Sequence, residues 1–291
     1  ETENDEIFQL LLNNENIKIG KGCFLGCKKL KHITIPDKIK TIGERAFKGC
    51  TSLTEINLPQ NVNKIEREAF RDCSSLEKIE LPQNINEIYG STFEGCTSLI
   101  QITIPSTTKK IGEYAFFKCK SLLQISLLSS LTSIADSAFR QCSSLILIVV
   151  PSLVTRIEKE TFRGCSSLEQ IELPKSLKSI CESAFKECTS LPEILIPSSV
   201  TDIGSYTFEQ CTSLIKLEIP SLVKKIEKGT FKGCSSLTTV LIPPSVSFID
   251  KEAFKECILL KEISIPPSIK IIEDSTFELC KSLLKIEIPD S

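Results

Sequence analysis

The chain has 291 residues, of which 35 are basic and 37 acidic, and its formal net charge is -2. This balance excludes a global electrostatic bias toward nucleic acid or anionic membranes. Hydrophobic residues make up 41% of the chain, but they recur at short intervals, and no stretch approaches the ~20 apolar residues of a membrane span. We therefore expect a folded protein with no nucleic-acid partner and no direct membrane insertion of this segment.

The first 18 residues lack the repeat that begins at residue 19. Their apolar run from Ile7 to Leu12 is typical of a short amphipathic segment. Because the end coils of a repeat protein need a cover over their apolar side chains, we predict that residues 1–18 form a cap. The alternative is that they belong to an earlier coil.

From residue 19 to residue 291, one unit of 23 residues recurs about twelve times. Twelve cysteines at this interval, from Cys27 and Cys50 to Cys280, mark the unit. A leucine follows each of these cysteines by three residues, a phenylalanine precedes it by three and an isoleucine by eight. A fixed period of this length indicates a solenoid, in which each coil buries its apolar side chains against its neighbours. Residues 19–291 are therefore predicted to form one solenoid domain.

Within one unit, residues Leu53–Leu58 alternate as a half-buried strand does, and Pro59 ends the strand. Val62 and Ile65 predict a second short extended or 3-10 segment, and Ala69–Phe70 predicts one helical turn that closes the coil. Stacking in register makes a ladder of parallel strands with right-handed connections. The predicted fold is a right-handed solenoid with short helical or 3-10 turns, of the α/β horseshoe-like class.

The chain contains fourteen cysteines, two of which, Cys23 and Cys181, lie outside the 23-residue column. A cysteine repeated in one structural role is typical of a buried free thiol, and disulfides or a metal site are the alternatives. Zinc sites require clustered thiols and imidazoles, but the chain has one histidine, His32. We expect reduced, buried column thiols, Cys23 in the core, and no metal or cofactor. Cys181 is expected to be more accessible but structurally neutral.

The pattern CxxLxxIxIPxxVxxIxxxAFxxC, which Cys50–Cys73 fits with Leu58 at the second isoleucine, resembles the BspA-like leucine-rich-repeat family of bacterial and protozoan surface proteins. The resemblance covers residues 19–291. It implies a curved solenoid, a role in adhesion or host-protein binding, and a cell-surface or secreted location. It brings no catalytic residue to this chain.

Solvent-facing positions on the predicted strand face lie four, five and seven residues after each column cysteine, and most are polar. A few consecutive coils instead carry apolar side chains there, and exposed apolar patches often mark interfaces. The candidate protein-binding patch comprises Ile100, Leu123, Ile146, Leu147 and Val149. The alternative is that these side chains stack on one another and bind nothing.

No catalytic arrangement is apparent, because the lone His32 leaves Ser- or Cys-based chemistry without its usual base. The sequence therefore favours a non-catalytic, adhesin-like module that binds a host or matrix protein. The alternative is a cytoplasmic scaffold that binds a cellular protein, since many free thiols suit a reducing compartment. Self-association is a further expectation, at the C-terminal strand edge near Ile286.

Overall fold

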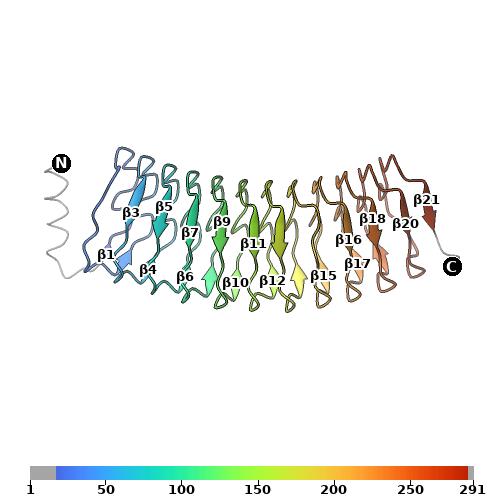
Figure 1. Ribbon diagram of the computed structural model, residues 1–291, viewed down its shortest axis with the longest axis horizontal. Helices are drawn as coiled ribbons and strands as arrows, with labels where there is room; N and C mark the ends of the chain where they lie inside the picture. Colours follow the sequence, from blue (N-terminus) through green and yellow to red (C-terminus); the bar gives the residue numbers. More distant parts are fainter. Residues whose placement is uncertain (1–17, 288–291) are drawn as a thin grey trace.

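The computed structural model describes residues 18–287, which form a gently curved rod of stacked coils (Figure 1). The strands β1 and β21 lie at opposite ends of this rod. The predicted cap, residues 1–18, falls outside the described residues except for Lys18. Between residues 18 and 287, no helix is long and apolar enough to cross a membrane.

Two rows of short parallel strands run along the rod. The three-residue row contains β3 Glu55–Asn57, β5 Lys78–Glu80, β7 Gln101–Thr103, β9 Gln124–Ser126, β11 Leu147–Val149, β13 Gln170–Glu172, β16 Lys216–Glu218, β18 Thr239–Leu241, β20 Glu262–Ser264 and β21 Lys285–Glu287. The two-residue row contains β1 Lys18–Ile19, β2 Thr41–Ile42, β4 Lys64–Ile65, β6 Glu87–Ile88, β8 Lys110–Ile111, β10 Ser133–Ile134, β12 Arg156–Ile157, β14 Ser179–Ile180, β15 Asp202–Ile203, β17 Lys225–Ile226 and β19 Phe248–Ile249. Both predicted extended segments are thus confirmed, with shorter bounds than the sequence suggested.

Every strand pair is in register, so each residue lies beside its equivalent 23 residues further on. Ile56 pairs with Ile79, and Ile79 pairs with Ile102. In every three-residue strand except the terminal β21, the central residue is buried and its two neighbours are exposed, as in β3 and β5. The 23-residue period therefore places chemically equivalent side chains in columns along the rod.

The structure does not show the predicted helical turn in residues 18–287. The segment around each phenylalanine consists of successive tight turns, in which Ala69 N–H donates to the Glu66 carbonyl and Cys73 N–H to the Phe70 carbonyl. Left-handed residues, such as Glu68 (φ 56°) and Asp72 (φ 59°), recur in coil after coil and break any helix. The freed N–H groups bond the next coil instead, as Phe70 N–H does with the Thr92 carbonyl. These hydrogen bonds between coils offset the cost of the left-handed backbone.

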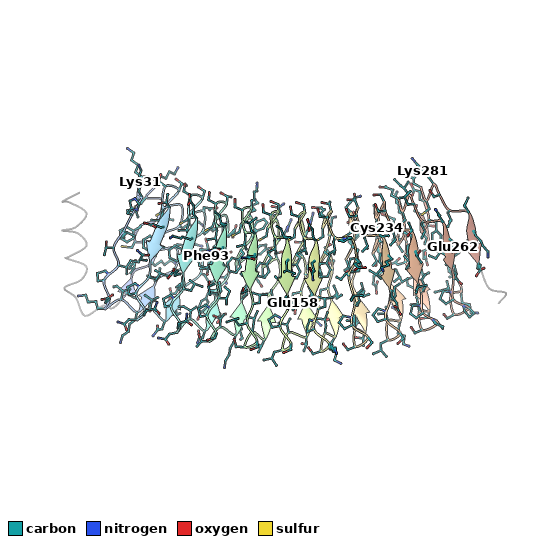
Figure 2. The ribbon with its side chains drawn as sticks, in the orientation of Figure 1. Lys31, Phe93, Glu158, Cys234, Glu262 and Lys281 are labelled. Carbon is teal, nitrogen blue, oxygen red and sulfur yellow. The ribbon has the colours of Figure 1, made fainter. Side chains whose placement is uncertain are left out.

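The core is built from side-chain columns. The phenylalanines from Phe24 to Phe277 stack face to face, with ring centroids 5.1 to 5.7 Å apart and interplanar angles up to 12°. Phe93 and Cys234 mark two core columns in Figure 2. The central coils bury their phenylalanine, cysteine and leucine completely. Each coil therefore depends on both neighbours for the burial of its apolar side chains.

All fourteen cysteines are free thiols in the structure, and the ten column cysteines from Cys50 to Cys257 are buried. Each of these ten donates its S–H to the phenylalanine carbonyl 26 residues earlier, as Cys73 does with Phe47 at 3.1 Å. Burial raises the pKa of Cys50 to about 11 and that of Cys165 to about 12. The expectation of burial is wrong for Cys23 and Cys27, which are exposed because they lie in the first described coil, and Cys280 in the last described coil is only half-buried.

Candidate functional site

The predicted patch lies on the exposed side of the three-residue row. Its five side chains are 40 to 46% exposed. Ile100, Leu123 and Ile146 occupy one column, four residues after the column cysteine, and a backbone hydrogen bond of 3.1 Å links each to the next. Leu147 and Val149 flank buried Ile148 in β11, so they face solvent beside that column. The structure brings all five together over three consecutive coils.

The apolar column continues beyond the predicted patch. Glu169 interrupts it for one coil, and Pro192 and Ile215 then follow at the equivalent positions. Ile215 is 50% exposed. Apolar side chains therefore occupy this column in five of the six coils from Ile100 to Ile215, half-buried Pro192 among them, and Glu169 is the exception.

The three-residue row is interrupted at Pro192. Six strands from β3 to β13 form one continuous sheet, and pairing resumes only with β16 and β18. Residues 193–195 form no strand. A proline has no N–H, so Pro192 cannot donate to the Glu169 carbonyl as the equivalent residues do in neighbouring coils. The sequence contains this signal, because Pro192 is the one proline in its column.

An open depression of about 610 Å³ lies at this interruption. Its lining comes from four consecutive coils and combines apolar, acidic and hydroxyl side chains: Ile146, Leu147, Glu169, Gln170, Ser190, Pro192 and Ser213. The depression shares Ile146 and Leu147 with the predicted patch and therefore adjoins it. Lys31 occupies the same column as Glu169 and lies along the inner, concave edge of the curved rod in Figure 2.

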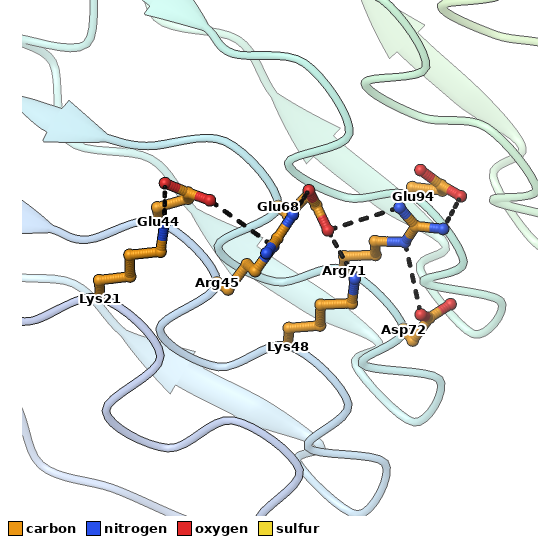
Figure 3. Close-up of polar contacts among 8 residues, drawn as sticks. All are labelled: Lys21, Glu44, Arg45, Lys48, Glu68, Arg71, Asp72 and Glu94. Atoms are coloured by element: carbon orange, nitrogen blue, oxygen red, sulfur yellow. Dashed lines mark hydrogen bonds and ion pairs between the residues drawn. The ribbon is translucent and has the colours of Figure 1, made fainter.

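A separate edge of the rod carries ion pairs that link successive coils. Figure 3 shows one such chain, in which Glu68 contacts Arg45 at 2.9 Å, Lys48 at 2.6 Å and Arg71 at 3.4 Å. The hydrogen bond from Arg45, together with Lys48, lowers the pKa of Glu68 to about 2. The chain continues from Arg71 to Glu94 at 2.8 Å. Because these charges compensate one another, this edge presents no track of uniform sign.

The off-column thiol Cys181 is half-buried beside two charged residues. The Arg156 guanidinium donates to its sulfur at 3.1 Å, and Glu158 lies 3.5 Å from the same atom. Burial, and secondarily Glu158, raises the pKa of Cys181. A raised pKa disfavours the thiolate, which is the reactive form. In residues 18–287, no group of three or more His, Cys, Asp or Glu side chains is placed to hold a metal ion.

The repeat matches a known family model. The BspA type leucine rich repeat region, in six copies, matches residues 3–120, 86–215 and 201–291. The chain belongs to the BspA-type leucine-rich-repeat family. The resemblance seen in the sequence is thereby confirmed, and leucine-rich repeats of this kind generally act as protein-interaction modules.

Several solved structures share this solenoid fold. A leucine-rich repeat protein from Bacteroides ovatus is 30% identical, with a TM-score of 0.68 over 89% of this chain and 81% of that one. A leucine rich cell surface protein from Faecalibacterium prausnitzii is 30% identical, with a TM-score of 0.64 over 94% and 83%. The pneumococcal vaccine antigen PcpA, at 21% identity and a TM-score of 0.56 over 88% and 71%, shares the fold. A search of curated proteins gave no match.

Proposed function

We propose that this chain is a non-catalytic, adhesin-like module that binds a host or matrix protein through the patch Ile100, Leu123, Ile146, Leu147 and Val149. The observation that carries the proposal is the local clustering of exposed apolar side chains. Every coil packs against its neighbours in the same way. If folding required apolar residues at these solvent-facing positions, all coils would carry them. Thr54, Glu77 and Thr238 occupy the same column outside the cluster. Clusters of this kind are typical of interfaces.

A cell-surface or secreted location accompanies this proposal. It is supported by the printed description of the F. prausnitzii relative as a cell surface protein. The second candidate is a cytoplasmic scaffold that binds a cellular protein. It is favoured by the fourteen free thiols, since a reducing compartment preserves thiols.

The test compares capture from two sources, an extracellular-matrix extract and a cytosolic extract. The parent chain is immobilised beside the variant Leu123→Glu/Ile146→Glu, and retained proteins are identified by mass spectrometry. We expect a matrix protein that the parent retains and the variant loses. Retention of cytosolic proteins alone would support the scaffold, and identical retention by parent and variant would contradict the patch.

A matched control separates the patch from added charge. Thr54→Glu/Thr239→Glu also adds two negative charges to exposed positions of the three-residue row. Because Thr54 and Thr239 lie outside the patch, this control should retain the partner. Loss of the partner from both variants would assign the effect to long-range repulsion instead.

A further inference from the structure

The depression beside Pro192 has two acceptors that nothing in the described chain satisfies. Glu169 N–H donates to the Ile146 carbonyl at 2.9 Å, but no backbone N–H in residues 18–287 donates to the Glu169 carbonyl. Four coils earlier, Glu77 occupies the same column, and its carbonyl accepts from Ile100 N–H at 3.0 Å. The interruption at Pro192 therefore leaves a backbone acceptor at the wall of the depression.

The carboxylate of Glu169 is also uncompensated. Its side chain is exposed and forms no ion pair within residues 18–287, whereas Glu193 nearby is paired with Lys216 at 3.4 Å. Glu169 is the one charged residue in an otherwise apolar column that runs from Ile100 to Ile215. A ligand that complements this surface carries a positively charged group, which meets the carboxylate, with an apolar group on either side, which meets the apolar side chains of the neighbouring coils.

We propose that this depression binds a partner protein through one basic side chain, arginine by preference, flanked by apolar side chains of the same segment. This inference rests on the proposed protein-binding function and specifies its partner. A guanidinium presents five donors in a planar fork, which suits a carboxylate beside further oxygen acceptors. Those acceptors are the Glu169 carboxylate and carbonyl, with the Ser190 and Ser213 hydroxyls lining the same depression.

The spacing of the coils specifies the sequence of the bound segment. Neighbouring coils lie about 4.8 Å apart, and an extended chain advances about 3.3 Å per residue. Side chains two residues apart in an extended segment are thus about 6.6 Å apart on one face. A segment running along the rod with its basic residue over Glu169 places the residues two before and two after it about 1.8 Å past Ile146 and Pro192, nearer to these two side chains than to those of the next coils. The predicted motif is apolar-x-basic-x-apolar.

The probe is a random peptide library displayed on phage, selected in parallel on the parent chain, on Glu169→Lys and on Glu77→Lys. Glu77→Lys is the matched control, because it reverses the same charge in the same column away from the depression. On the parent and on the control we expect enrichment of arginine or lysine with apolar residues at both flanking positions. Selected peptides should bind Glu169→Lys at least tenfold more weakly than the parent.

The outcomes separate this inference from the proposed function. Enrichment without a basic residue, equal enrichment on Glu169→Lys, or no enrichment on any of the three proteins would overturn the inference. If Leu123→Glu/Ile146→Glu still loses its captured partner in that case, the patch stands and only the basic-residue site fails. If instead capture is unaffected by the patch variant while peptides depend on Glu169, the patch fails and the depression stands.

Discussion

Replacing one central phenylalanine tests how the coils depend on one another. Phe162 is fully buried, and its ring stacks between Phe139 at 5.7 Å and Phe185 at 5.6 Å. Burial of a phenylalanine in a core is worth about 3 to 5 kcal/mol against alanine. Stacked rings contribute about 0.5 to 1.5 kcal/mol per pair beyond their area. Because Phe162→Ala removes stacking contacts on both sides of the ring, we expect the free energy of unfolding to fall by about 4 to 5 kcal/mol, which is the upper part of the range for replacing a buried phenylalanine.

The assay is chemical denaturation followed by circular dichroism, since the chain has no tryptophan. Coils interact only with their neighbours, so the weakened coil should separate two halves and turn one transition into two. Phe277→Ala is the matched control, because Phe277 is only partly buried and has one described stacking partner, Phe254. If Phe162→Ala lowers the free energy of unfolding no more than Phe277→Ala does, the phenylalanines do not depend on both neighbouring coils for their burial.

Three further predictions concern thiols, acid and the patch. A thiol reagent should modify exposed Cys23 and Cys27 at once, and all fourteen cysteines in denaturant; two or fewer reactive thiols in denaturant would mean disulfides. Glu68→Gln should lower the free energy of unfolding at pH 7 by roughly 1 to 2 kcal/mol, because the folded pKa is held below the unfolded value and solvent screens part of the interaction. The stability that the Glu68 carboxylate contributes is complete above the unfolded pKa near 4.5 and is lost as pH falls toward 2. The difference in free energy of unfolding between the parent chain and Glu68→Gln should therefore roughly halve at pH 3. A difference in urea midpoints that does not change with pH would contradict this. Leu123→Glu/Ile146→Glu should change the free energy of unfolding by less than about 1 kcal/mol, because both side chains are exposed, and a larger loss in urea would place them in the core.

The period of the sequence predicts most of the fold, because one structural role recurs in every coil. Leu53, Ile56 and Phe70 are buried as their columns indicate. The length of the segment around each phenylalanine did not predict its turn geometry. Its left-handed residues are stabilised by hydrogen bonds to the next coil, and segment length carries no information about those bonds. A signal was present, however. The position before the column cysteine holds glycine in several coils, including Gly49 and Gly95, and glycine is favoured where φ is positive.

The candidate site was predicted in part. Exposure of Ile100, Leu123 and Ile146 follows from strand alternation, which is a local property. The depression depends on a missing hydrogen bond between coils, and a pattern of apolar residues carries no information about it. Pro192 would have located it, since one proline in a column of N–H donors must break the ladder.

The central claim is that the apolar patch on the three-residue row binds a protein. The most direct measurement is the Kd of the captured partner for the parent chain, for Leu123→Glu/Ile146→Glu and for Thr54→Glu/Thr239→Glu, by titration calorimetry. Buried apolar anchors of an interface lose about 2 kcal/mol or more when replaced, so the patch variant should bind at least about tenfold more weakly. The control should match the parent. A patch variant that folds normally and keeps the parental Kd would contradict the claim.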